Sequence, residues 1–140
     1  MKGTKELGVN EGPTSLGGRV VRLALVLAAL LVMVAAGWTF LTLSWAYSEG
    51  ERAGVLQKFS KKGWICKTFE GEVAQYVVGG VAPQIWYLSV RDERVAAQLF
   101  KAVGQNVQLH YTEHRGIPTS CFGDTPYFAQ SFTIIPTATR

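Results

Sequence analysis

Four residues near the C-terminal end have side chains that could do chemistry: His110, His114, Cys121 and Asp124. Imidazole, thiolate and carboxylate groups bind zinc, and a cysteine beside a histidine and an acid is the pattern of a thiol nucleophile. The spacing, His-x3-His followed by Cys-x2-Asp, matches no standard zinc site, and no helix N-terminus is predicted there to activate the thiol. We therefore assign no catalytic residue, no metal ligand and no cofactor. A metal- or thiol-dependent hydrolase using residues 110–124 is kept as an alternative.

The two cysteines, Cys66 and Cys121, both lie in the C-terminal part of the chain. In an oxidising compartment a disulfide between them would close a long loop, which is the arrangement that stabilises most. Two unpaired thiols, with Cys66 as a small apolar strand residue, are the alternative. The sequence does not give the distance between the two residues, so both interpretations stay open.

Aromatic residues and charge bear on what the chain binds. Trp64, Trp86, Tyr87 and Tyr111 would suit the stacking surface of an OB fold, although core packing is the ordinary role of such residues in a small barrel. After residue 47 the chain holds ten Lys and Arg against eight Asp and Glu. Because nucleic-acid binding usually needs clustered basic residues, this small surplus leads us to exclude nucleic acid as a partner.

The elements that must position these residues begin with an uncharged segment, Leu23–Trp45, in which eleven residues are Leu, Val or Phe. A helix of this length spans about 34 Å, enough to cross a hydrocarbon core of about 30 Å. A cleavable signal peptide is the rival, but the apolar run is longer than the core of a signal peptide. We predict a transmembrane helix at residues 23–45 that follows a disordered basic tail, residues 1–22.

The orientation of this helix in the membrane is less clearly indicated by the sequence. Four Lys and Arg precede the span and four follow soon after it, so the positive-inside count does not decide. Arg19 and Arg22 lie directly before the span, whereas the lysines after it lie 13 to 17 residues beyond Trp45. A short basic N-terminus is also the usual flank of a signal anchor. We therefore predict that the N-terminus is inside and that the C-terminal domain is extracytoplasmic.

A juxtamembrane helix is predicted at residues 46–63. Ser48 and Glu51 have the spacing of a capping box, and Gly63 supplies a stop signal. Leu56 and Phe59 would then share one face of the helix. That face is a docking surface for the domain, the membrane or a partner.

From residue 64 the pattern changes to strands, at residues 64–78, 85–90, 107–112 and 127–135. A helix at residues 91–103, with Asp92 as its N-cap, separates the second strand from the third. This order is typical of the OB-like Greek-key barrel, in which one helix joins the third and fourth of five strands. Counting a bend at Gly71 as a strand break gives five strands. Without that break, a four-stranded sheet with one helix is the alternative. We predict a mostly-β, OB-like domain at residues 64–136 and a tail at residues 137–140.

The segment YSEGERAGVLQKFSKKGW, residues Tyr47–Trp64, is followed by KTFEGE at Lys67–Glu72. It resembles an uncharacterised family of small bacterial single-span membrane proteins that share the block YSEGxRAGxLxKxSxKG. The resemblance covers about Trp45 to Ile135 and implies a bacterial membrane-anchored β-domain, with no catalytic residues to carry over. Some members carry the label 6-phosphogluconate dehydrogenase. The sequence does not support that activity, because 140 residues hold neither a Rossmann unit nor its fingerprint.

These patterns predict a membrane-anchored extracytoplasmic binding or structural module of the bacterial inner (cytoplasmic) membrane, and not an enzyme. Its expected partners are the lipid bilayer and a membrane protein, with no nucleic acid. A cytoplasm-facing accessory subunit of a membrane complex is a further alternative.

Overall fold

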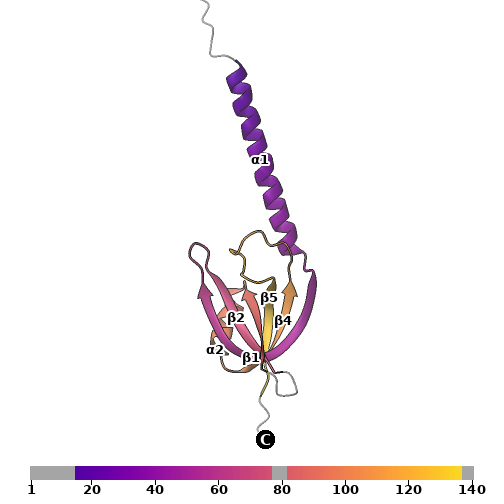
Figure 1. Ribbon diagram of the computed structural model, residues 1–140, viewed down its shortest axis with the longest axis vertical. Helices are drawn as coiled ribbons and strands as arrows, with labels where there is room; N and C mark the ends of the chain where they lie inside the picture. Colours follow the sequence, from indigo (N-terminus) through magenta and orange to yellow (C-terminus); the bar gives the residue numbers. More distant parts are fainter. Residues whose placement is uncertain (1–14, 77–81, 137–140) are drawn as a thin grey trace, which may run out of the picture. The chain divides into compact units, whose positions relative to one another are not determined.

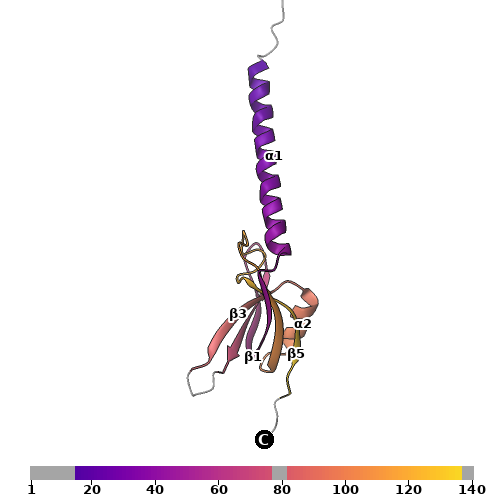
Figure 2. The same cartoon turned by 90° about the vertical axis from the view of Figure 1, so that its right-hand side faces the viewer.

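The computed structural model describes residues 15–76 and 82–136. The N-terminal tail up to residue 14 and the predicted tail at residues 137–140 lie outside the described residues. By its contacts the chain divides into two units, residues 1–38 and 39–140, and each is described by itself. Figures 1 and 2 show a long helix, α1, and a small β-domain with one short helix.

Helix α1 runs from Ser15 to Ser44. The segment Gly17–Ser44 is long and apolar enough to cross a membrane, with a mean hydropathy of 2.6 in a window that is 0% buried. A membrane anchor and a signal segment both have these properties. The helix starts before the predicted Leu23, so the prediction of disorder up to residue 22 is wrong for residues 15–22. Arg19 and Arg22 do not interrupt the helix, because arginine is a good helix former whose long side chain reaches polar surroundings.

The prediction of a juxtamembrane helix at residues 46–63 is wrong, because Ser48–Lys62 form one long strand, β1. The first half of β1 pairs with β4 (Asn106–Glu113), and its second half pairs with β2 (Thr68–Gln75). Each half of β1 therefore forms its backbone hydrogen bonds with a remote strand, whereas a helix would have formed them within the segment. The capping-box spacing of Ser48 and Glu51 is a local signal that the long-range pairing overrides.

Two glycines of β1 lie close to neighbouring strands. A Cβ on Gly54 would come within 2.5 Å of the carbonyl oxygen of Ala74, and one on Gly50 would lie 3.2 Å from the hydroxyl of Tyr111. The close approach of neighbouring strands therefore needs glycine at residue 54. In a helix, each of these glycines would cost about 1 kcal/mol relative to alanine.

The described strands close into a barrel in the order β1-β2-β3-β5-β4, with β3 at Gln84–Val90 and β5 at Tyr127–Ile134. All neighbouring strands are antiparallel except β3 and β5, which form a short parallel pair. The predicted fold class, a five-stranded OB-like barrel with one helix, is confirmed. The route to five strands was wrong, however: β2 continues through Gly71, and β1 supplies the extra strand.

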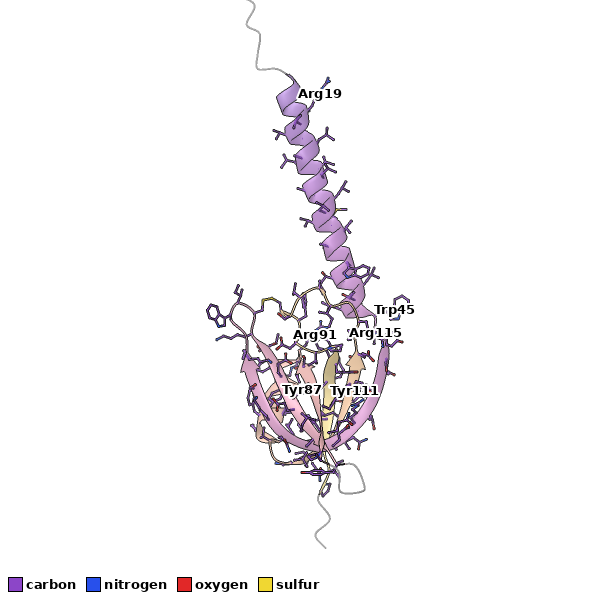
Figure 3. The ribbon with its side chains drawn as sticks, viewed as in Figure 1. Arg19, Trp45, Tyr87, Arg91, Tyr111 and Arg115 are labelled. Carbon is purple, nitrogen blue, oxygen red and sulfur yellow. A yellow bond between two sulfur atoms is a disulfide. The ribbon has the colours of Figure 1, made fainter. Side chains whose placement is uncertain are left out.

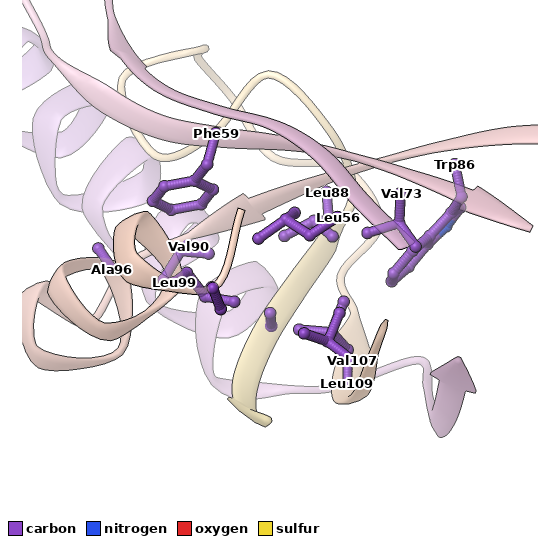
Figure 4. Packing of buried hydrophobic residues seen from close by; sticks show 12 residues of the cluster. Leu56, Phe59, Val73, Trp86, Leu88, Val90, Ala96, Leu99, Val107 and Leu109 are labelled. Carbon is purple, nitrogen blue, oxygen red and sulfur yellow. The ribbon is translucent and has the colours of Figure 1, made fainter. Parts of the chain in front are cut away.

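Helix α2 (Glu93–Lys101) connects β3 to β4 and closes one side of the core. The side-chain Oδ1 of Asp92 accepts a hydrogen bond from the backbone nitrogen of Arg94 at 2.7 Å, which confirms the predicted N-cap. Ala96 and Leu99 are fully buried. Figure 4 shows how the helix meets the apolar residues of the strands, which include Leu56, Phe59, Val73, Leu88, Val90, Val107 and Leu109.

Leu56 and Phe59, predicted as a docking face on a helix, are both core residues of β1, with exposed fractions of 0% and 7%. Residues three apart on a regular strand point to opposite faces. The register of β1 against β2 shifts between Leu56 and Lys58, and this bulge turns both apolar side chains inward. The bulge therefore produces the spacing that suggested a helix.

Candidate functional site

Two loops lie side by side at one end of the barrel, as Figures 1 and 2 show. Loop L12, residues 63–67, joins β1 to β2, and loop L45, residues 114–126, joins β4 to β5. Cys66 and Cys121 form a disulfide between them, with their Cα atoms 4.9 Å apart, and Figure 3 draws its sulfur–sulfur bond in yellow. Gly63 has a positive φ of 131°, so the residue expected to end a helix instead makes the turn into L12.

A groove of about 350 Å³ lies on the outer face of β1, β2 and β3, beside L45. Cross-strand pairing sets out its polar side chains in two rows. One row is Lys58, Glu72 and Tyr87. The other is Ser60 and Glu70, which line the groove, followed by Ser89, which is fully buried. Because side chains alternate along a strand, Gly71 and Leu88 between the rows face the core.

The row through Glu70 holds L45 down on the sheet. Glu70 is only 8% exposed, and its Oε2 accepts a hydrogen bond from the hydroxyl of Ser89 at 2.7 Å. Its Oε1 accepts from the backbone nitrogen of Asp124 at 3.1 Å, and the nitrogen of Thr125 donates to the Ser89 hydroxyl at 3.1 Å. A buried carboxylate is costly unless it is hydrogen-bonded, and here both oxygens have protein donors. This network fixes the wall of the groove.

The other polar side chains of the groove remain open to solvent. Lys58 Nζ lies 3.0 Å from Glu72 Oε1, and Lys62 Nζ lies 2.7 Å from Asp124 Oδ2. The hydrogen bond to Asp124 raises the pKa of Lys62 above its ordinary value. Pairs this exposed are worth at most about 1 kcal/mol, so a ligand can take over their hydrogen bonds at little cost. Tyr87, labelled in Figure 3, adds an aromatic ring that is 55% exposed.

The four aromatic residues predicted as a stacking surface divide into two pairs. Trp86 is only 6% exposed, and its ring lies 5.1 Å from that of Tyr111 and 5.0 Å from the guanidinium of Arg52, so it belongs to the core. Trp64 and Tyr87 are exposed, by 101% and 55%. Of the four, only Trp64 in L12 and Tyr87 on β3 are exposed, and of these two Tyr87 lines the groove.

The residues considered for a hydrolase are not brought together. Cys121 is held in the disulfide, and Asp124 pairs with Lys62. His114 is 5% exposed, and its Nδ1 lies 2.9 Å from the carbonyl oxygen of Thr42. Among the described residues, no group of three or more His, Cys, Asp and Glu side chains is placed to hold a metal ion. In this form the loop has no free thiol that could act as a nucleophile.

Sequence reasoning missed most of the groove. The sequence pattern predicts a helix at Lys58 and a bend at Glu70-Gly71-Glu72, whereas the structure has continuous strands at both places. The sequence does carry a strand signal here: one acidic residue on each side of a glycine fits the outward–inward–outward alternation of a strand. Gly71 is the inward residue, where a Cβ would lie 3.1 Å from the ring of Phe59.

Comparisons with known proteins address the fold. A family model described as a domain of unknown function (DUF8785) matches residues 45–135. No curated protein matches the sequence. A similar solved structure is the crystal structure of the mitochondrial single-stranded DNA-binding protein Rim1 from S. cerevisiae, with a TM-score of 0.51 and 9% sequence identity. The similarity covers 68% of this chain and 100% of that one, and at this identity it concerns the fold.

This similarity corrects the exclusion of nucleic acid as a partner. The exclusion rested on the small surplus of basic residues in the C-terminal domain. A single-stranded DNA-binding protein has a similar fold, however, and OB folds bind oligonucleotides through local contacts on one face. The overall charge of the domain is therefore the wrong criterion, and the exclusion is withdrawn.

Proposed function

We propose that this chain, which belongs to the family defined by the domain of unknown function DUF8785, is a membrane-anchored binding module. The groove of β1, β2 and β3 binds an extended polar ligand. The observation that carries this proposal is a groove of half-exposed polar side chains and one tyrosine, walled by a loop that a disulfide and a buried carboxylate hold in place. OB barrels bind oligosaccharides and oligonucleotides at this face and at these two loops.

An oligosaccharide is the first candidate ligand. The ring of Tyr87 offers a flat apolar face on which a sugar ring can stack, because one face of a pyranose carries mainly C–H groups. Glu72 and Asp124 accept hydrogen bonds from hydroxyls, whereas Lys58 and Lys62 donate to them. A groove that presents donors and acceptors around one ring suits a neutral, hydroxyl-rich polymer.

Single-stranded nucleic acid is the second candidate, favoured by the similarity to a single-stranded DNA-binding protein. Here a base would stack on Tyr87, and the two lysines would contact phosphates after leaving their carboxylate partners. The two candidates place the same ring and the same lysines against different ligands, so one pair of binding measurements separates them.

We further propose that α1 anchors the protein in the bacterial inner membrane, with Arg19 and Arg22 on the cytoplasmic side. The C-terminal domain then lies outside the cytoplasm. The disulfide supports this orientation, because such bonds persist in oxidising compartments and are rare in the cytosol.

A topology reporter tests the orientation. An enzyme that is active only outside the cytoplasm, fused after Arg140, is expected to be active in bacterial cells. The matched control is the same reporter fused directly before Arg19, which should be inactive. Activity of the second fusion alone would reverse the proposed topology.

Replacing Tyr87 by alanine is expected to weaken ligand binding about tenfold, because a stacking contact of this kind is worth about 1–3 kcal/mol. The full chain in lipid nanodiscs is titrated with labelled oligosaccharides and with labelled single-stranded DNA, and fluorescence anisotropy gives the two Kd values. Tyr76→Ala is the matched control, since Tyr76 is 69% exposed and lies outside the groove.

Binding of DNA alone, weakened by Tyr87→Ala, would favour the second candidate over the first. Equal affinities of the Tyr87→Ala and Tyr76→Ala variants for every ligand bound would remove the groove as the binding site.

A further inference from the structure

Trp64 and Ile65 are the most exposed large apolar residues of the described chain, with exposed fractions of 101% and 96%. They are neighbours in L12, and the disulfide of the next residue, Cys66, ties that loop to L45. Removing such a side chain from water is favourable, and in water this loop leaves two of them exposed. Adjacent exposed apolar side chains on a constrained loop indicate a surface that another phase or molecule covers.

The end of the barrel that carries L12 is also the end at which the chain continues into α1. Within the second unit, Nδ1 of His114, the first residue of L45, lies 2.9 Å from the carbonyl oxygen of Thr42 in the last turns of α1. The backbone nitrogen of Tyr47 donates to the carbonyl oxygen of Glu113 at 2.7 Å. By covalent continuity, the apolar segment leaves the domain beside L45, and the disulfide keeps L12 next to L45.

The residue types around the exposed pair select a bilayer as its occupant. Tryptophan is the residue enriched at membrane–water interfaces, where its ring lies at the level of the headgroups. Lys61 precedes the pair and Lys67 follows it. Anionic headgroups attract lysines that lie near a membrane surface.

We propose that L12 inserts Trp64 and Ile65 into the interfacial region of the bilayer that α1 crosses. Lys61 and Lys67 then face anionic headgroups, and the barrel has two attachments to the membrane in place of one. The two attachments thereby fix the orientation of the groove of β1, β2 and β3 relative to the membrane surface. This inference rests on the proposed membrane anchor, and it does not depend on which ligand the groove binds.

Quenching by brominated lipids tests the inference. The full chain carrying Trp38→Phe and Trp45→Phe is placed in nanodiscs of phosphatidylethanolamine and phosphatidylglycerol, with or without bromine on the acyl chains. The same chain with Trp64→Phe added is measured in parallel. Subtracting the second spectrum from the first leaves the emission of Trp64, because buried Trp86 contributes to both. We expect this emission to be blue-shifted and to lose at least half its intensity in brominated lipid.

Two control variants distinguish a failure of L12 to insert from a failure of α1 to span the bilayer. Tyr76→Trp in the chain without Trp38, Trp45 and Trp64 places a reporter at the other end of β2, and it should not be quenched. A chain that retains Trp45 but lacks Trp38 and Trp64 reports on α1 and should be quenched if α1 spans the bilayer.

Quenching of Trp45 without quenching of Trp64 would overturn this inference and leave the anchor standing. No quenching at either position would overturn both. A blue-shifted but unquenched Trp64 would mean that protein covers the loop, and this result also contradicts the inference.

Discussion

Replacing Cys66 and Cys121 together by serine is expected to lower the free energy of unfolding of the barrel by about 4 kcal/mol. The disulfide joins residues that are 55 positions apart. Closing a loop of that length removes conformational entropy from the unfolded chain, which corresponds to about 4 kcal/mol at 25 °C. For a domain of roughly 90 residues, this loss corresponds to a decrease in Tm of roughly 15–30 °C.

The measurement is denaturant unfolding of the full chain in detergent micelles, followed by far-UV circular dichroism and, in a chain carrying Trp38→Phe, Trp45→Phe and Trp64→Phe, by the fluorescence of buried Trp86. Reducing the unmodified protein should shift the transition as far as the double substitution does, because both open the same loop. The single variant Cys66→Ser should match the double variant. If both variants unfold at the same denaturant concentration as the unmodified protein, the bond does not constrain the unfolded chain, and L45 is held by the Glu70 network alone.

The sequence predicted the elements whose signals are local. The helix α1 follows from an uncharged apolar run, and α2 follows from Asp92 and from the apolar spacing that buries Leu99. The alternation through Val107 and Leu109 marks β4, where both residues are fully buried. The order of these elements along the chain agreed with an OB-like barrel, although the fifth strand came from β1 and not from a break in β2.

The sequence could not predict β1, because the pairing that makes it a strand is remote. Its partners are β4, about 60 residues away, and β2 on its other side. The bulge between Leu56 and Lys58 gives two inward residues a helical spacing, and Ser48 with Glu51 gives a local capping signal that the ladder overrides. Local chemistry and global packing disagree here, and packing prevails because it buries Leu56 and Phe59.

The candidate site could be predicted from the sequence even less than β1. Its residues come from three strands and one loop, and only the register brings Lys58, Glu72 and Tyr87 into one row. No motif encodes such a row. The cysteines could be named as a pair from the sequence, but their distance and the neighbouring Glu70 network depend on the folded barrel.

Replacing Phe59 by alanine is the second large effect, with an expected loss of about 3–5 kcal/mol in the free energy of unfolding. Phe59 is 7% exposed, and its ring packs edge-on against that of Phe100 at 4.8 Å and lies parallel to that of Phe69 at 6.3 Å. The truncation would leave a cavity between β1, β2 and α2, in the region shown in Figure 4. Around Phe59 the backbone of β1 pairs with β2, which pairs in turn with β3, so these ladders limit how far the strands can move to fill the cavity.

Lys61→Ala is the matched control, because Lys61 is exposed on the same strand and its Nζ only lies over the ring of Phe69, at 4.7 Å. Losing that contact costs at most about 1 kcal/mol. The two variants are compared by denaturant unfolding of the full chain in micelles. A large loss for Phe59→Ala with little change for Lys61→Ala is the pattern expected of a core strand. Equal, small losses would mean that β1 contributes no core side chain here, and the barrel would then have to be stable with its bulged strand unpacked.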